Sequence, residues 1–231
     1  MAVLLAIDIG NTRLKWGMHD GHRWLIRTAS ATGQLPNPSG VDRTIFSNVV
    51  DQQLDADIVQ RFPQAHKICA LPQQCGVRNG YRDPATLGSD RWAALIGAQA
   101  LGARTAVIAS AGTALTVDAL HDGQFLGGSI GPGLDALRQA LAARTGLSAA
   151  ESSGIADFPV DTSSAVRSGC LAALVGPVER MRERLACHSG RETEVWLCGG
   201  NATEIAGQLA GRIEEYLVLE GLARIAQEIW P

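Results

Sequence analysis

Short apolar runs separated by glycine turns divide the chain into alternating strands and helices. Period-two and continuous apolar patterns predict strands at residues 3–9, 13–18, 23–28, 43–50, 105–109, 114–120, 124–130, 194–198 and 216–219. Spacings of three and four predict helices at residues 51–61, 90–101, 134–144, 162–187 and 221–229. A break in the long helix is expected near Gly176 and Pro177, because proline lacks the backbone donor that a helix interior needs.

The same order of elements occurs twice along the chain. Each half begins with a strand hairpin and a third strand, and continues with alternating helices and strands, from Val3 and from Thr105. This order predicts an α/β fold with mixed sheets, in two domains at 1–104 and 105–231. The last helix is expected to pack back on the first domain. The chemistry is expected in a cleft between the halves.

Composition excludes several classes of function. The 231 residues are 46% hydrophobic and 19% charged, with a net charge of -3 and no Lys/Arg cluster, so nucleic acid is not an expected partner. We expect no membrane span, because no apolar run approaches the roughly 20 residues that one needs, and no signal peptide, because Asp8 interrupts the first apolar run. Five cysteines without C-x-x-C spacing favour free thiols in a cytoplasmic protein.

The first glycine turn follows the first predicted strand and carries an acid, a hydroxyl and a base. Gly10 permits a close backbone approach, and successive N–H groups with the Thr12 hydroxyl could face a phosphate. Asp8 stands where Mg²⁺ could be held, and Lys15 could add a point charge. An ordinary hairpin turn, with Asp8 as a turn residue, is an alternative explanation for the same residues.

Two later turns also place glycines directly after an apolar strand. Gly112 and Thr113 follow the apolar strand that opens the second half, and Gly199 and Gly200 follow the strand ending at Cys198. The first could grip a polyphosphate together with the turn at Asp8, and the second could let a ring or phosphate lie against the backbone. Simple hairpin and strand-to-helix turns, with glycines that serve packing only, are the alternative for each.

In their order and spacing, the three turns resemble the two phosphate motifs and the adenosine motif of the superfamily that contains actin, heat-shock ATPases and sugar kinases. Within it, further segments resemble type III pantothenate kinases. The most specific is Tyr81 followed by Leu87-Gly88-Ser89-Asp90-Arg91 and then Gly97-Ala98. The segments 127–133, 162–169 and 217–222 also match, so the resemblance spans nearly the whole chain. It implies two actin-like (ribonuclease H-like) domains around a nucleotide cleft.

The resemblance further implies phosphorylation of pantothenate by ATP, the first step toward coenzyme A. Asp90 would be the general base on the acceptor hydroxyl, and Asp8 would organise Mg²⁺, through water. The residues implied in ATP binding are Asp8, Ile9, Gly10, Asn11, Thr12, Arg13, Leu14, Lys15, Gly112, Thr113, Gly199 and Gly200. Those implied in substrate binding are Tyr81, Gly88, Ser89, Asp90, Arg91 and Thr162. Asp90 could instead be a helix N-cap beside a surface Arg91, and Thr162 a first-turn residue behind an Asp161 cap.

One position departs from the family pattern. The family generally carries an acid three positions before the second phosphate threonine, where it is associated with K⁺ or NH₄⁺, but this chain has Ser110 there. A hydroxyl is a poorer ligand for a hard cation than a carboxylate, so weak or absent K⁺ stimulation is expected.

The family pattern also implies a homodimer. The apolar face at Val166, Cys170, Leu174, Val178, Met181 and Leu185 could serve a dimer or be buried within the subunit. Three alternatives to a pantothenate kinase stay open from the sequence: a kinase for another small hydroxyl compound, a non-catalytic regulatory protein, and a plain ATPase of the same fold.

Overall fold

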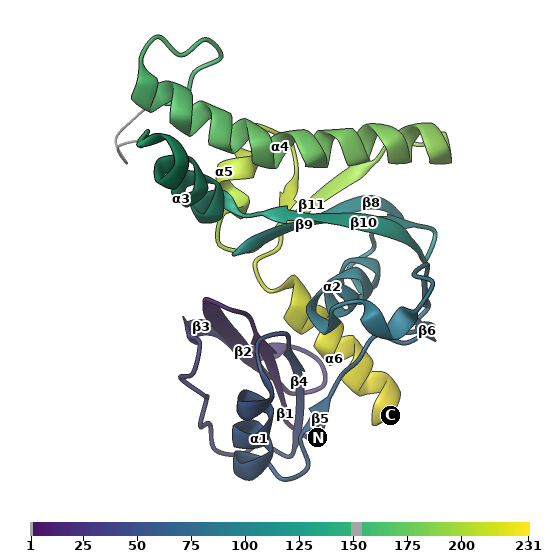
Figure 1. Cartoon of the computed structure of the whole chain (residues 1–231). Coiled ribbons are helices and arrows are strands. Elements are labelled where there is room, and N and C mark those ends of the chain that lie inside the picture. The colour runs from purple at the N-terminus through teal and green to yellow at the C-terminus, as the bar shows by residue number, and fades with distance from the viewer. Residues whose placement is uncertain (1, 149–153) are drawn as a thin grey trace. The chain divides into compact units, whose positions relative to one another are not determined.

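The computed structural model describes residues 2–148 and 154–231, which divide into two compact units (Figure 1). The first unit comprises Met1–Arg104, Leu120–Gly127 and Tyr216–Pro231, and the second comprises Thr105–Ala119 and Gly128–Glu215. Relative to a boundary at 104/105, residues 120–127 and 216–231 group with the first unit. The chain therefore leaves and re-enters the first unit after its main segment ends.

A five-stranded sheet in the order β3-β2-β1-β4-β5 forms the framework of the first unit. Its strands are β1 (Leu4–Ile9), β2 (Arg13–His19), β3 (Trp24–Ala31), β4 (Arg43–Asn48) and β5 (His66–Lys67). The first three strands are antiparallel neighbours, whereas β4 runs parallel to both β1 and β5. The sheet is therefore mixed, as the sequence pattern predicts.

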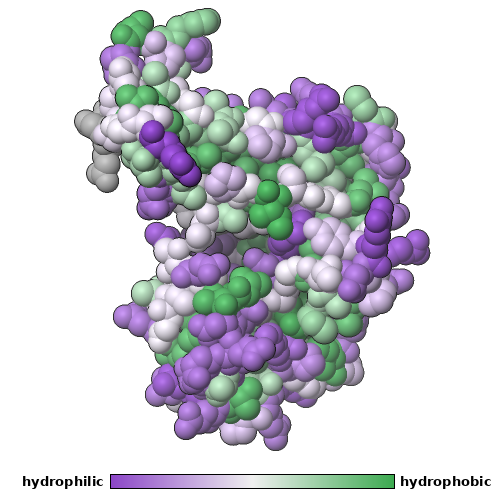
Figure 2. All heavy atoms as spheres, in the orientation of Figure 1, coloured by the Kyte–Doolittle hydropathy of each residue, from purple (hydrophilic) through white to green (hydrophobic). Residues whose placement is uncertain are grey.

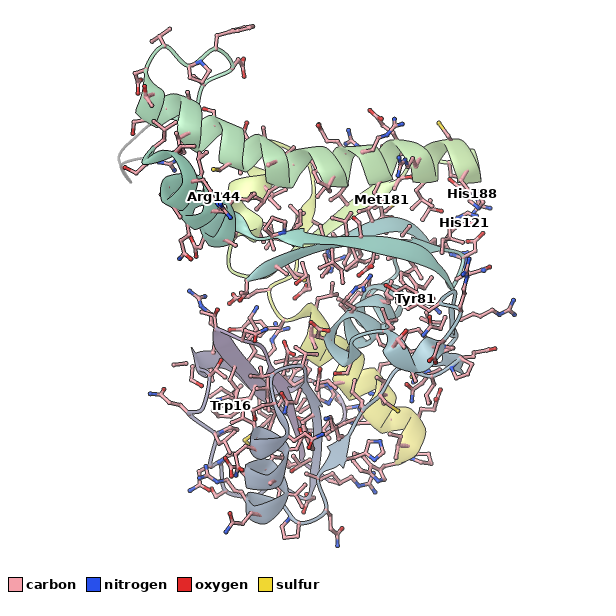
Figure 3. The ribbon with its side chains drawn as sticks, viewed as in Figure 1. Trp16, Tyr81, His121, Arg144, Met181 and His188 are labelled. Atoms are coloured by element: carbon pink, nitrogen blue, oxygen red, sulfur yellow. The ribbon has the colours of Figure 1, made fainter. Side chains whose placement is uncertain are left out.

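Alternation along β1 separates two chemically different faces of this sheet. Leu5, Ile7 and Ile9 are fully buried in one cluster with Ile58 of helix α1 (Gln52–Arg61). Trp16, which lies opposite Ile7 on β2, packs against the same cluster (Figure 3). Asp8 belongs to the other face, because successive side chains of a strand point to opposite sides. Helices α2 (Ser89–Ala100) and α6 (Leu217–Ile229) contact β4 and β1 in this unit.

Two glycines allow α2 and α6 to pack with their backbones in contact. A Cβ on Gly221 would collide with the backbone of Ala93, and one on Gly97 would collide with the carbonyl oxygen of Leu217. Neither neighbour is a flexible side-chain end that could move aside. Gly97 and the segment containing Gly221 both belong to the family-like motifs, so part of that resemblance is explained by helix packing alone.

The second unit repeats the strand order of the first. Strands β8 (Thr105–Ala111), β9 (Ala114–His121), β10 (Gln124–Pro132), β11 (Glu194–Cys198) and β12 (Arg212–Ile213) form the order β10-β9-β8-β11-β12. Beyond β10, the sheet continues through β7 (Val77–Asn79) and β6 (Gln73–Gln74), and β7 pairs with Gln124 and Phe125, at the start of β10. The remaining helices are α3 (Leu134–Thr145), α4 (Thr162–Ser189), α5 (Ala202–Ala206) and the 3₁₀ helix η1 (Pro84–Thr86). The predicted α/β class with two similar mixed sheets is confirmed.

The expected break near Gly176 and Pro177 is wrong, because α4 runs without interruption from Thr162 to Ser189. Pro177 and Ala173 are both exposed, so the carbonyl group that loses its helical partner faces water. Leu174 and Val178, on either side of the proline, are fully buried and hold the two turns on the second unit's core.

The apolar face of α4 is used within the subunit. Five of its six predicted members are buried, and Met181 is half-buried (Figure 3). The helix contacts β8 and β11 of its own unit. This face is therefore occupied by the second unit's own core.

One smaller expectation also differs from the structure, and one stretch without a predicted element contains short ones. Residues 216–219, expected as a strand, form the first turn of α6, because Leu217 and Leu219 belong to a longer helical apolar pattern that continues to Ile229. The polar stretch 72–89 contains β6, β7 and η1, whose short lengths give too few residues for a periodic signal.

The helices and the cysteines bear on two further expectations from the sequence. Among residues 2–148 and 154–231, no helix has both the length and the apolar character to cross a bilayer. In the view of Figure 2, hydrophobic side chains lie scattered among hydrophilic ones. All five cysteines are free thiols, as the sequence predicts.

Candidate active site

A polar row crosses the α2- and α6-covered face of the first sheet. Asp8 of β1 lies directly beside Ser47 of β4 and directly opposite Lys15 of β2. Ser47 is fully buried, and its hydroxyl is 2.8 Å from that of Ser89, the first residue of α2. The register of the three strands and the position of the first residue of α2 thus place an acid, a base and two hydroxyl groups together within a single unit.

The carboxyl group of Asp8 has an unusual affinity for protons. Burial, and then the negative charge of Asp90, raise the pKa of Asp8 from 3.8 to about 7, although Lys15 opposes the change. Burial also raises the pKa of Asp90, against the backbone N–H and the positive charge of Arg91. Two carboxyl groups that interact and are poorly solvated form a site that favours a proton or a cation.

Asp90 lies in the first turn of α2 and is not its N-cap. The cap is Gly88, and Asp90 Oδ1 accepts a hydrogen bond of 2.8 Å from the Arg91 backbone N–H. A Cβ on Gly88 would come within 2.6 Å of the same oxygen, so glycine leaves space beside this carboxyl group. The capping alternative for Asp90 is therefore wrong, and the carboxyl group needs another explanation.

Arg91 is a buried cation beside two aromatic rings. Only 6% of the residue is exposed, and its Nη1 donates a 2.9 Å hydrogen bond to the Tyr81 hydroxyl. The guanidinium lies 5.6 Å from the Tyr81 ring centroid and 5.9 Å from that of Phe125 (Tyr81 is labelled in Figure 3). The two rings pack at 5.3 Å. A guanidinium held this way is a fixed cationic donor for an anionic group.

The turn after β1 is tight and presents polar residues to solvent. Gly10 N–H donates to the Arg13 carbonyl at 3.0 Å, and the Thr32 hydroxyl donates to the Gly10 carbonyl at 2.7 Å. Asn11, Thr12 and Arg13 are exposed. Ile9 and Leu14, by contrast, are fully buried in the core, so only their main-chain atoms could contact a nucleotide.

Three glycine turns meet in the second unit. The Gly133 N–H donates to the Thr113 carbonyl at 3.1 Å, and the Asn201 N–H donates to the Ala111 carbonyl at 2.9 Å. Gly199 has a φ of 91° and lies so close to Ala111 that a Cβ would be 2.5 Å from that residue's carbonyl oxygen. The turns β8–β9, β10–α3 and β11–α5 thus form one glycine-lined surface. Thr113 and Gly200 are exposed on it.

Two further candidates lie in the second unit. Ser110 is half-buried in β8 beside Cys198 of β11. Thr162 is exposed as the first residue of α4, whose N-cap is Asp161, with its carboxylate accepting from Ser164 N–H at 2.9 Å. The predicted Asp161 cap is therefore present, and Thr162 stands in the first turn behind it.

The acidic side chains of this cluster suit a cation that is bound partly by the protein and partly by a substrate. The described ranges hold no group of three or more His, Cys, Asp or Glu side chains that could bind a metal without help. Mg²⁺ commonly uses one or two carboxylates and completes its shell with water and phosphate oxygens. Asp8 and Asp90, whose mutual repulsion and burial favour a nearby positive charge, fit that requirement.

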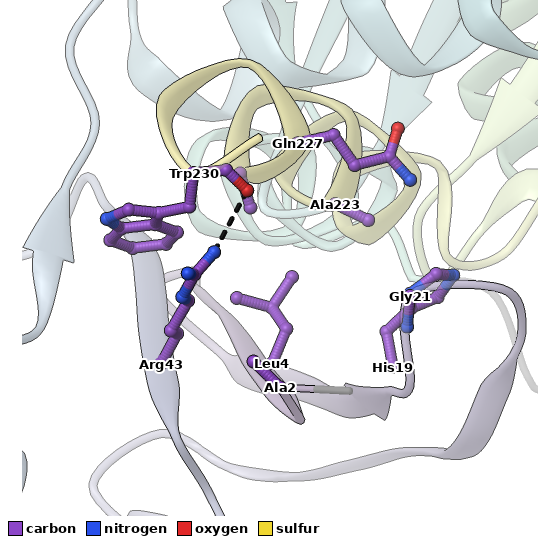
Figure 4. A pocket seen from close by; sticks show the side chains of 9 residues that line it. Ala2, Leu4, His19, Gly21, Arg43, Ala223, Gln227 and Trp230 are labelled. Carbon is purple, nitrogen blue, oxygen red and sulfur yellow. Dashed lines mark hydrogen bonds between the residues drawn. The ribbon is translucent and has the colours of Figure 1, made fainter.

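A small cavity in the first unit lies apart from this cluster. Leu4, His19, Arg43, Ala223 and Trp230 are among the residues that line about 80 Å³ of space (Figure 4). Leu4 begins β1, whereas Asp8 is near its other end, roughly 13 Å away along a strand. The cavity is too small for a nucleotide.

Sequence reasoning missed the residues that support the site. Ser47 and Phe125 lie in strands and belong to no recognisable motif, so the sequence gives no direct sign of their roles. Ser47 could have been noticed as a hydroxyl within the apolar strand at residues 43–50, but nothing in the sequence links Phe125 to Arg91.

Comparisons with known proteins indicate the family to which the chain is related. The family model for type III pantothenate kinase matches residues 4–184. A type III pantothenate kinase from Nitrosospira multiformis is 42% identical, covering 98% of this chain and 92% of the relative. One from Nitrosomonas eutropha is 43% identical, covering 97% and 94%.

Solved structures resemble this one in fold. A protein from Campylobacter jejuni, described as a Baf family transcriptional activator, matches with a TM-score of 0.65 and 19% identity, covering 97% of this chain and 98% of its own. A protein from Sinorhizobium meliloti, described as a 2-dehydro-3-deoxygalactonokinase, matches with a TM-score of 0.63 and 17% identity over both whole chains. At these identities the likeness shows the fold alone. The family model and the curated relatives go further, and this chain belongs to the type III pantothenate kinase family.

Proposed function

We propose that this chain transfers the terminal phosphoryl group of ATP to the primary hydroxyl of pantothenate, with Asp90 as general base. The observation that carries the role of Asp90 is its environment: a desolvated carboxyl group with a raised pKa, one residue from a buried arginine. A carboxylate with a raised pKa accepts a proton more readily than an ordinary aspartate. Most of the remaining rate enhancement in phosphoryl transfer comes from positioning and charge neutralisation.

The acceptor is held, in this proposal, by the segment that precedes and opens α2. Pantothenate carries a carboxylate, and the Arg91 guanidinium, fixed by Tyr81, is suited to an anion. Backbone groups at Gly88 and Ser89 contribute further contacts, and Thr162 stays a predicted contact from the second unit. A carboxylate bound at Arg91 would orient the other end of the acceptor, where the hydroxyl lies.

The nucleotide is held by the glycine turns. Asn11, Thr12, Arg13 and Lys15 would contact phosphates from the first unit, together with main-chain atoms of residues 8–14. Gly112, Thr113, Gly199 and Gly200 would line the nucleotide from the second unit. Asp8 would hold Mg²⁺, which supplies charge neutralisation on the phosphates when bound.

The monovalent-cation requirement is proposed to be weak. Ser110 replaces the acid that the family pattern places there, and a hydroxyl adds no negative charge for K⁺ or NH₄⁺. We expect turnover to change by less than about twofold when Na⁺ replaces K⁺ at constant ionic strength. A steep rise with K⁺ would contradict this expectation.

We further propose a homodimer in the cytoplasm. The free thiols and the use of ATP suit a reducing compartment. Because the α4 apolar face is buried within its own unit, the dimer must use another surface. Sedimentation analysis of the purified protein tests the assembly, and a monomer at micromolar concentration would refute it.

The kinase proposal is tested by ADP release with pantothenate and Mg·ATP, for wild type, Asp90→Asn and Asp57→Asn. Asp57 lies on α1, which packs on the opposite face of the sheet, and its carboxylate accepts a 3.0 Å hydrogen bond from the Gln53 side chain. Loss of a general base lowers turnover by about 10²-fold or more. We expect that loss for Asp90→Asn and none for Asp57→Asn. A folded, ATP-binding wild type without pantothenate-dependent turnover would overturn the substrate assignment.

A further inference from the structure

An aromatic ring lies beneath the lysine of the first phosphate turn. Lys15 Nζ is 5.5 Å from the ring centroid of Tyr216, the N-cap residue of α6. Both residues belong to the first unit and are half-buried. A lysine side chain has four rotatable bonds and a compact charge, so a fixed ring next to its ammonium group restricts where that charge lies.

A second cation also contacts the Tyr216 ring. The Arg27 guanidinium of β3 is 4.9 Å from the Tyr216 centroid, and Arg27 Nη1 donates to Glu220 Oε1 at 2.8 Å. Trp24 Nε1 donates to the same carboxylate oxygen at 2.9 Å. Glu220 is one helical turn after Tyr216 on α6, so the carboxylate and the ring share one side of the helix. The β2–β3 hairpin and α6 are thus joined by one small network.

Strand register explains why this network meets the polar row. Lys15 and Gly17 project to the same face of β2, and Gly17 lies directly opposite Arg27. A Cβ on Gly17 would be 2.9 Å from a carbon of the Trp24 ring, so the glycine makes room for that ring over the sheet. Lys15 is also the partner of Asp8 across the β1–β2 ladder. The support for Lys15 therefore comes from β3 and from the start of α6.

We propose that Tyr216 is a positioning residue that sets the place of the Lys15 ammonium group for the phosphates of ATP, and that Glu220 fixes Tyr216 through Arg27. This inference rests on the proposed function only in assigning Lys15 to the nucleotide. It gives the closing family-like segment at 217–222 a role beyond helix packing. Tyr216 acts through Lys15, so its loss affects the nucleotide and leaves the acceptor alone.

The experiment compares Mg·ATP binding by calorimetry, without acceptor, and steady-state kinetics for Tyr216→Leu and Tyr216→Phe. The matched control is Trp230→Leu, at the other end of the same helix. The Trp230 ring also packs with an arginine, Arg43, at 5.5 Å (Figure 4). Arg43 begins β4, four residues before Ser47 of the polar row. Far-UV circular dichroism and urea midpoints verify that each variant is folded.

We expect Tyr216→Leu to weaken Mg·ATP binding and kcat/KM for ATP by about three- to tenfold, with KM for pantothenate unchanged. Tyr216→Phe keeps the ring and stays within about twofold of wild type. In a Lys15→Ala background, Tyr216→Leu has almost no further effect, because the lysine it positions is absent.

Two results would overturn the inference: equal effects of Tyr216→Leu and Trp230→Leu, or an undiminished effect of Tyr216→Leu in the Lys15→Ala protein. If Tyr216→Leu fails to fold, Glu220→Gln keeps the ring and weakens only its anchor. A smaller loss in the same direction supports the inference, and no loss overturns it. The binding series needs no acceptor, so it remains decisive even if pantothenate proves not to be the substrate.

Discussion

Replacing Asp8 by asparagine is predicted to stabilise the nucleotide-free protein at alkaline pH while it disables catalysis. The folded protein binds the Asp8 proton more tightly than the unfolded chain, because the pKa rises from 3.8 to about 7 on folding. Stability from this group is therefore fully present below pH 4 and is lost as the pH rises through 7. An asparagine at this position does not titrate, so it adds no pH dependence to the free energy of unfolding.

The magnitude follows from the two pKa values. At about 1.4 kcal/mol for each pH unit, the carboxylate costs at most about 4 kcal/mol at pH 8, of which about 2.6 kcal/mol develops between pH 5 and pH 8. Water penetration and relaxation around a partly buried site reduce this, so we expect Asp8→Asn to gain about 1–2 kcal/mol over wild type between these pH values. Turnover should fall by about 10²-fold, because asparagine cannot supply the charge that Mg²⁺ requires.

The assay is urea unfolding at pH 5 and pH 8 without nucleotide or Mg²⁺. Tryptophan fluorescence follows mainly the first unit, which contains Trp16, Trp24, Trp92 and Trp230 of the five tryptophans. Asp57→Asn makes the same chemical change on the opposite face of the sheet. A difference between Asp8→Asn and wild type that is the same at both pH values would refute the reasoning, whatever its size.

Three other substitutions probe separate parts of the structure. Tyr81→Phe removes the oxygen that accepts from Arg91, so kcat/KM for pantothenate should fall about tenfold while KM for ATP is unchanged in steady-state assays; equal loss for both substrates would contradict a role confined to the acceptor. Gly221→Ala forces a Cβ into the α2 backbone, and we expect about 2–4 kcal/mol of destabilisation in urea titrations; a wild-type midpoint would contradict the packing. Gly199→Ala combines a positive φ with a backbone clash, so nucleotide affinity should fall at least about tenfold in calorimetry with Mg·ADP, and unchanged affinity would exclude this turn from the site.

The sequence predicts the architecture well where local pattern and tertiary packing agree. The first strand, expected at 3–9, is β1 at Leu4–Ile9, and the turn at Gly10 lies where its glycine and polar neighbours predict. Pro177 shows the opposite case. A local rule predicts a helix break, but buried leucine and valine neighbours and a solvated carbonyl group keep the helix intact.

Only those residues of the candidate site that stand in sequence motifs could be predicted. Asp8, Asp90 and Arg91 stand in motifs, whereas the burial that alters their chemistry depends on strand register and on a helix more than 120 residues later in the chain. Tyr216 and Glu220 are ordinary residues in the sequence, and they acquire significance only because α6 lies beside β2. Periodicity carries no information about such distant neighbours.

The return of residues 216–231 to the first unit has a consequence during synthesis. The sheet face that bears Leu4 and Ala6, and the surface of α2 around Ala93 and Gly97, are covered by a helix that a ribosome makes after the entire second unit. The first unit cannot complete its core as it emerges, although its strands are made first. Nascent chains halted before residue 216 would expose this apolar surface to chaperones and proteases, so the two units mature together.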